Sequence, residues 1–245
     1  MPPIATGRHL TALFSRVVDH IETSVPRTIS AVSNGVDLNE ATRLHVEKAV
    51  DSLVEEFAGM QSRETIQRVM DDSLQQLVGD AQVDDFVPTL AHRFARERLK
   101  AIGRRLGPES TLPDIVFVGL GDTGRGQMAA ALLTLRSEGS IVAHSAGRTA
   151  QRAIDPAVVE VMNELGVDLS EAYAKPLSPE VLEAADIVVT MGRSVGAVEI
   201  PRGTRHLDWR VGDPSGAPVA EARRVRDDID RRVAELITDL GGDEV

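Results

Sequence analysis

Residues 114–130 read Asp-Ile-Val-Phe-Val-Gly-Leu-Gly-Asp-Thr-Gly-Arg-Gly-Gln-Met-Ala-Ala. The run from Ile115 to Val118 is apolar and rich in β-branched residues, which predicts a buried parallel strand. Glycines then crowd a short loop, and the pattern becomes helical from Gln127. A strand, a glycine-rich loop and a helix in this order can bind an anion, because loop N–H groups converge where the positive end of the helix dipole lies.

The candidate anion-binding loop covers residues 119–126. Its members are Gly119, Leu120, Gly121, Asp122, Thr123, Gly124, Arg125 and Gly126. Arg125 stands where the loop becomes helix, and its guanidinium could bind a phosphate-like group through paired hydrogen bonds. The loop contains no Cys, Ser or His, and Thr123 has no His within the motif to activate it. The sequence therefore predicts a binding loop with a cationic clamp and without an evident nucleophile.

Composition narrows the classes of function. The 245 residues carry a net charge of −11. Up to residue 110 there are 13 Lys and Arg against 16 Asp and Glu, and beyond it 14 against 22, so neither part is basic. This balance argues against nucleic-acid partners and anionic membranes. The absence of Cys excludes disulfides, zinc–thiolate sites and thiol catalysis.

The remaining composition favours a protein without metal or membrane. The six His are scattered and form no ligand pair at helical spacing, so we predict no metal site and no cofactor. No apolar run approaches the ~18 residues of a membrane span. The N-terminus, Met-Pro-Pro-Ile-Ala-Thr, lacks the pattern of a signal peptide, and we expect a cytoplasmic protein.

The first part of the chain is predicted to be helical. Residues 1–36 form an arm whose apolar stripe predicts a helix over 8–24. A capping-box pattern at Asp37 and Glu40 begins the next helix. Further helices are expected from Ser62 and over about 87–102. We therefore predict a three-helix bundle over 37–103, with the extra helix 8–24 as a packing arm or a contact for a homodimer or protein partner.

The basic stretch 92–100 is the sole candidate for a DNA-reading helix in the bundle. Glu97 stands between Arg96 and Arg98, and the region up to residue 110 as a whole is not basic. A solvated helix face with Arg/Glu pairs is the favoured interpretation.

Residues 104–113 are rich in Gly and Pro and are predicted to form a linker. From 114 to 245 strands and helices alternate, which predicts an α/β fold: a small, doubly wound, parallel four-stranded sheet. The expected strands cover 115–118, 141–144, 187–190 and 205–207, and the expected helices 126–137, 156–165 and 219–240. Asp155 is the predicted N-cap of the second of these helices. Ligands bind such sheets at the carboxyl ends of the strands, where the glycine-rich loop lies.

Residues 114–240 resemble the low-molecular-weight protein tyrosine phosphatases and, within that family, the arsenate reductases. The residues that carry the resemblance are Phe117-Val118, Gly124-Arg125, Gln127-Met128-Ala129, Ser145-Ala-Gly, Asp155-Pro156, Gly166-Val-Asp-Leu-Ser, Lys175-Pro-Leu, Ala184-Ala-Asp-Ile-Val-Val-Thr-Met-Gly, Asp208-Trp209 and Asp213-Pro214. The helical part, most clearly Phe94-Ala-Arg-Glu-Arg-Leu, is similar to the N-terminal domain of some actinobacterial arsenate-reductase-like proteins.

The resemblance also shows what this chain lacks. The family loop is Cys-x5-Arg-Ser, and its thiolate is the nucleophile. Here the Cys position is Gly119 and the Ser position is Gly126, while the Asn that braces the family loop is Asp122. The redox cysteines of thioredoxin-linked arsenate reductases would fall on Arg193 and Ala197. The resemblance therefore implies a degenerate member without catalytic residues.

Two acidic residues bear on the remaining chemistry. The resemblance implies that Asp213 occupies the position of the acid that protonates the leaving group. Asp122 opposes anions, since a carboxylate ~5 Å from a bound phosphate costs roughly 3 kcal/mol per unit charge at an effective dielectric near 20. Arg125 could offset about that much, or pair with a carboxylate such as Asp122. Alternatively, Asp122 turns inward to the loop N–H groups.

The leading hypothesis is a catalytically inactive regulatory or interaction module. It would sense a phosphate- or arsenate-like oxyanion, or a phosphorylated partner, through residues 119–126. One alternative is residual arsenate reductase or phosphatase activity by a route without cysteine. Another is nucleotide binding, since residues 119–124 also match Gly-x-Gly-x-x-Gly. The next predicted strand ends at His144-Ser145 rather than at an acid for a ribose, although Arg148 could meet a 2′-phosphate.

Overall fold

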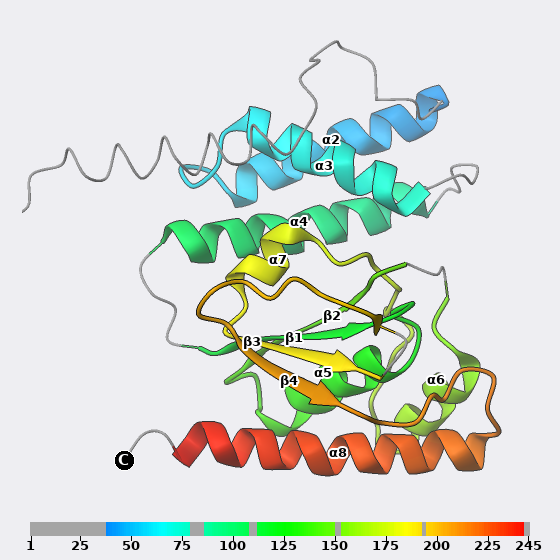
Figure 1. The fold of residues 1–245 in the computed structure, drawn as a ribbon. Helices are drawn as coiled ribbons and strands as arrows, with labels where there is room; N and C mark the ends of the chain where they lie inside the picture. The colour runs from blue at the N-terminus through cyan, green and yellow to red at the C-terminus, as the bar shows by residue number, and fades with distance from the viewer. Residues whose placement is uncertain (1–37, 79–85, 108–111, 150–152, 193–194, 243–245) are drawn as a thin grey trace, which may run out of the picture. The chain divides into compact units, whose positions relative to one another are not determined.

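The computed structural model describes residues 38–78, 86–107, 112–149, 153–192 and 195–242 (Figure 1). The predicted arm 1–36, with its helix over 8–24, lies outside the described residues. Residues 36–245 make one compact unit. Among the described residues, none of the helices combines the length and the apolar character that a membrane crossing requires.

Three helices form the predicted bundle: α2 (Glu40–Glu56), α3 (Arg63–Val78) and α4 (Val87–Leu106). Their apolar stripes meet in one core, which includes Val50, Leu53, Ile66, Met70 and Leu99. Leu44 of α2 is not part of this core and is 50% exposed.

Both ends of the bundle differ from the prediction. Asn39, not Asp37, caps α2, because its Oδ1 accepts a hydrogen bond from the Thr42 N–H at 2.9 Å. Helix α4 continues to Leu106, so the first residues of the expected linker 104–113 are helical. Arg104 and Arg105 in its last turn suit the negative end of the helix dipole and pair with Asp114 and Glu183.

The sheet has the predicted strands in the order β2-β1-β3-β4, and all pairs are parallel. The strands are β1 (Asp114–Gly119), β2 (Val142–Gly147), β3 (Ile187–Met191) and β4 (Arg205–Trp209). Strand β2 begins one residue later and ends three residues later than expected. The small residues at the end of β2 continue its pairing with β1 as far as Gly119 and Gly147. Because these residues are not strongly apolar, the hydrophobic pattern did not predict that the strand extends so far.

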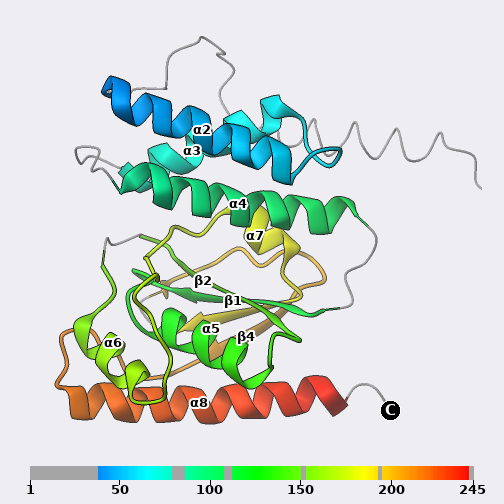
Figure 2. The ribbon, with the colours of Figure 1, turned by 180° about the vertical axis from the view of Figure 1, so that it is seen from behind.

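Helices cover both faces of the sheet (Figures 1 and 2). Helices α5 (Arg125–Arg136), α6 (Pro156–Asn163) and α8 (Val219–Gly242) pack on one face, and α7 (Pro179–Ala184) lies with α4 on the other. Side chains alternate along β1, so Ile115 and Phe117 enter the first core while Val116 and Val118 enter the second. Both faces of β1 are therefore buried, as its continuous apolar run predicted.

The short helix α7 is absent from the sequence prediction. Ser178 caps it by accepting a hydrogen bond from the Val181 N–H, and Pro179 occupies its first turn. With six residues it is too short for an apolar period to stand out. The cap at Asp155 on α6, by contrast, is as predicted: its Oδ1 accepts from the Ala157 N–H at 2.9 Å.

Arg98 corrects the interpretation of the basic stretch 92–100 as solvated. It is 4% exposed and donates hydrogen bonds to Ser73 of α3 and Glu180 of α7. It also pairs with Asp72 at 2.6 Å. Arg96 does behave as predicted, since it is exposed and pairs with Glu56 of α2. One arginine of this stretch therefore joins the bundle to the helix that covers the sheet.

Arg98→Met should lower the free energy of unfolding by about 3 kcal/mol, because the buried pair loses its cation while the carboxylates remain. The matched substitution Arg96→Met should cost about 1 kcal/mol or less, since it removes an exposed pair. Urea unfolding followed by circular dichroism measures both. Equal, small losses for the two variants would show that the Arg98 cluster does not hold α7 to the bundle.

Candidate functional site

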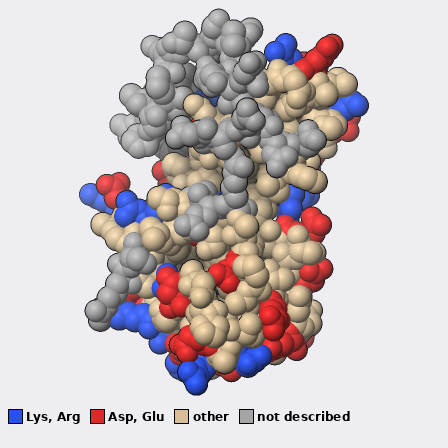
Figure 3. All heavy atoms as spheres, turned by 90° about the vertical axis from the view of Figure 1, so that its right-hand side faces the viewer, with Lys and Arg blue, Asp and Glu red and all other residues tan. Residues whose placement is uncertain are grey.

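The loop 119–126 lies at the carboxyl end of β1, directly before α5. Gly119, Asp122, Gly124, Arg125 and Gly126 are buried, Gly121 and Thr123 are half-buried, and Leu120 is 40% exposed. Figure 3 shows the face toward which the strands point, where acidic and basic side chains are intermingled. Attraction of an anion to this face therefore depends on local groups rather than on a broad basic surface.

Neighbouring segments hold the loop's carbonyl groups. The N–H of Arg148 donates to the Gly119 carbonyl at 3.2 Å, and the N–H of Thr149 donates to the Leu120 carbonyl at 2.8 Å. The N–H of Asp155 donates to the Thr123 carbonyl at 2.9 Å. In a planar trans peptide the C=O and N–H groups point in opposite directions. A carbonyl that accepts a fixed hydrogen bond therefore also fixes the direction of the N–H group in the same peptide.

The N–H groups of the same loop have no such partners. Among the described residues, no acceptor takes a hydrogen bond from the backbone N–H of any residue from Leu120 to Gln127. The first bonded amide of this region is that of Met128, which donates to the Gly124 carbonyl at 2.9 Å. Consecutive free amides at the start of a helix are the arrangement that binds oxyanions in proteins.

Asp122 turns inward, but its acceptor atoms do not meet the loop N–H groups. The residue has a φ of 55° and is 2% exposed. Its Oδ2 accepts hydrogen bonds from Gln127 Nε2 at 2.9 Å, Lys175 N at 3.1 Å and Ser145 Oγ at 3.3 Å. Its Oδ1 has no partner among the described residues. Burial raises the pKa of this carboxyl to about 6.

Arg125 and Asp213, far apart in the sequence, lie together. Arg125 is 9% exposed, and its Nη2 lies 3.2 Å from Asp213 Oδ2. Its Nη1 donates to the Val211 carbonyl at 3.5 Å. Gly192 allows this position, because a Cβ there would stand 2.2 Å from Nη1. Arg125 is thus paired with Asp213 rather than with Asp122.

The glycines at both ends of the loop leave different amounts of room. A Cβ at Gly119 would meet nothing nearer than 3.9 Å, so a side chain fits there. A Cβ at Gly126 would lie 3.2 Å from Asp122 Oδ1 and 3.3 Å from the Phe117 carbonyl, which is tight. Position 119 is therefore an open position beside the free amides, and no thiol exists in the chain to fill it.

The residues considered for a nucleotide make contacts within the protein. Arg148 Nη1 donates to the Val195 carbonyl at 2.8 Å. Burial alone would lower the pKa of His144, but hydrogen bonds to Asp114 and Glu97 raise it to about 9. The described residues contain no cluster that could hold a metal ion.

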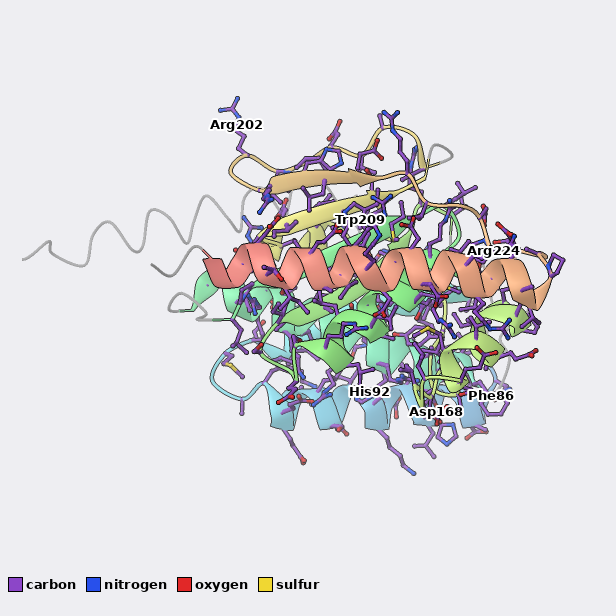
Figure 4. All side chains as sticks on the ribbon, turned by 90° about the horizontal axis from the view of Figure 1, so that it is seen from below. Phe86, His92, Asp168, Arg202, Trp209 and Arg224 are labelled. Atoms are coloured by element: carbon purple, nitrogen blue, oxygen red, sulfur yellow. The ribbon has the colours of Figure 1, made fainter. Side chains whose placement is uncertain are left out.

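Two large aromatic side chains of the α/β part, Trp209 and Tyr173, are buried packing residues. Trp209 is 7% exposed, and its ring centroid lies 5.5 Å from that of Phe117. Figure 4 labels Trp209 beside α8, whose residues share the same core. Tyr173 is 9% exposed, and its carbonyl accepts a hydrogen bond from Gln127.

Some contributors to the site gave no signal of their role in the sequence. Lys175 holds Asp122 with its backbone N–H, and its Nζ lies 3.5 Å from Glu97 of α4. Glu97 also meets His144 Nδ1 at 2.6 Å. These residues are far apart in the chain, so spacing could not connect them. Gln127, directly after the loop, could have been noted as a polar residue in the first turn of an otherwise apolar helix.

Gly119→Cys should place a thiol among the free amides and give it a pKa well below the ordinary value of about 8.5. Alkylation by iodoacetamide, measured by mass spectrometry from pH 5 to 10, gives that pKa directly, because the chain has no other thiol. The exposed variant Ala58→Cys serves as control. A thiol at 119 that titrates like the one at 58 would show that the loop amides do not converge.

Two family comparisons match separate parts of the chain. Residues 46–103 match the family described as "Protein-tyrosine-phosphatase-like, N-terminal domain". Residues 114–245 match the family described as "Low molecular weight phosphotyrosine protein phosphatase". The expected resemblance of both the helical part and the α/β part is thereby confirmed.

Individual relatives agree with these matches. The chain is 35% identical over 134 residues to a putative arsenate reductase of Halobacterium salinarum. This alignment covers 52% of this chain and 93% of that protein. It is 31% identical over 121 residues to an arsenate reductase of Bacillus cereus, with coverages of 49% and 90%. The structure of a thioredoxin-dependent arsenate reductase of Corynebacterium glutamicum aligns with a TM-score of 0.73 and 32% identity, over 81% of this chain and 98% of that one. The chain belongs to the low-molecular-weight phosphotyrosine protein phosphatase family and carries the N-terminal helical domain found with it.

Proposed function

We propose that this chain is a catalytically inactive member of its family that binds a tetrahedral oxyanion at loop 119–126 and acts as a regulatory or interaction module. The observation that carries the proposal is the row of N–H groups from Leu120 to Gln127, which have no acceptor among the described residues, beside the open position at Gly119. The first feature favours binding, and the second removes the covalent step.

No group at the loop replaces the missing thiolate. The Ser145 hydroxyl donates to Asp122 and is 2% exposed, so it is not free to attack. A hydrolytic route through water needs a base. The Asp213 carboxylate is paired with Arg125. The Asp122 carboxyl group is 2% exposed, so little of it is open to an attacking water.

The ligand class follows from the donors. Backbone amides and a guanidinium suit phosphate, arsenate or the phosphoryl group of a modified side chain. Asp213 is half-exposed, so its carboxylate can turn to solvent when an anion takes its place on Arg125. The relatives named as arsenate reductases make arsenate and phosphate the first ligands to test.

The partner of such a module is not defined by the loop. The expected helix 8–24, which lies outside the described residues, is the proposed contact for a second copy or for another protein. Residual phosphatase or arsenate reductase activity by a route without cysteine is the competing function, and the experiment below separates the two.

Calorimetric titration with phosphate and with arsenate should show saturable binding that weakens 10-fold or more in Arg125→Ala, because a charge-assisted hydrogen bond is worth about 1.5–3 kcal/mol. Arg210→Ala removes an exposed arginine that pairs with the exposed Asp208 and should bind like the wild type. No turnover of an aryl phosphate above buffer is expected.

Two results would contradict the proposal. Turnover that disappears in Arg125→Ala would establish the enzymatic alternative. Absence of binding by the wild type would show that the loop no longer receives an anion.

A further inference from the structure

We propose that Asp122 couples anion binding to proton uptake, so that the loop binds its oxyanion together with one proton on the Asp122 carboxyl group. This inference rests on the proposed function and concerns the regulation of the same site. It makes the loop an oxyanion receptor whose affinity rises as the pH falls.

The position of Asp122 is the first argument. Its backbone is part of the row of free amides, and its side chain is 2% exposed beneath them. Its Oδ1 has no partner among the described residues and lies so close to Gly126 that a Cβ there would be 3.2 Å away. An oxyanion held by these amides would therefore lie close to a carboxylate that is itself buried and little screened by solvent.

Charge repulsion is the second argument. Two negative charges ~5 Å apart at an effective dielectric near 20 weaken binding on the order of 100-fold. A proton on the carboxyl group removes this repulsion. Oδ1 is the atom that can carry the proton, because Oδ2 already accepts hydrogen bonds from Gln127, Lys175 and Ser145.

The surrounding groups decide whether the proton is accessible near neutral pH. Burial raises the pKa of Asp122 to about 6, Lys175 and the Ser145 hydroxyl lower it, and Glu97 of α4 raises it. The remaining polar groups around it are the Gln127 amide of α5 and the buried Tyr173. A bound anion raises the pKa further, because it disfavours the charged carboxylate.

Two nearby ionisable groups, Glu97 and His144, do not change their charge in the pH range in which Asp122 is expected to titrate. The pKa of Glu97 is lowered despite burial, because Lys175 and His144 stabilise its charge. The pKa of His144 is raised to about 9. Both therefore keep their charge between pH 5.5 and 7.5, and a change in affinity over this range points to Asp122.

Sulfate is the probe, since it remains a dianion over this range whereas phosphate titrates. Calorimetric titration of the wild type should show affinity that falls about 10- to 20-fold from pH 5.5 to 7.5. At pH 7, titrations in two buffers of different protonation heat should show uptake of close to one proton per sulfate.

Asp122→Asn is the matched variant, because an amide has the shape of the protonated carboxyl group and no charge. It should bind sulfate at pH 7.5 at least 10-fold more tightly than the wild type, without proton uptake. Asp51→Asn changes the net charge equally at an exposed position of α2 and should keep the wild-type pH profile.

The outcomes separate this inference from the function on which it rests. Sulfate binding by the wild type with no pH dependence and no proton uptake overturns the proton coupling and leaves the oxyanion receptor in place. Absence of sulfate binding by both the wild type and Asp122→Asn at every pH overturns both. If Asp122→Asn does not fold, proton uptake by the wild type decides alone.

Discussion

The buried carboxylate of Asp122 connects loop 119–126 to three neighbouring segments of the fold. Asp122 Oδ2 accepts hydrogen bonds from α5 through Gln127, from β2 through Ser145 and from the Lys175 backbone. Lys175 and His144 then meet Glu97 of α4, so the contacts continue from the loop into the helical bundle. The loop is thus supported from the sheet, from its own helix and from the N-terminal domain.

The sequence predicted the sheet well, because its signals are local. The run from Ile115 to Val118 is apolar on both faces, and the structure buries both faces. The cap at Asp155 was predictable because it depends on neighbouring residues. The pairing of Arg98 with Glu180, across 82 residues, was not predictable, since nothing local distinguishes Arg98 from the exposed Arg96.

The site was predictable as a loop but not as a network. Gly119 and Arg125 were evident from the order of strand, glycines and helix. The orientation of Asp122 was left open, because the residue type alone does not determine whether its side chain faces inward or outward. Its partners come from three separate segments, so only the tertiary fold determines that they converge. The same convergence puts Arg125 beside Asp213.

The central claim is that the amides of this loop receive an oxyanion although the nucleophile is missing. Backbone ¹⁵N–¹H chemical shifts during a phosphate titration test it most directly, because each amide reports separately. The account predicts saturable shifts concentrated between Leu120 and Gln127, with the amides of the bundle unchanged. The account would be contradicted if the loop amides showed no chemical-shift change, or if the changes were scattered over amides near surface arginines instead.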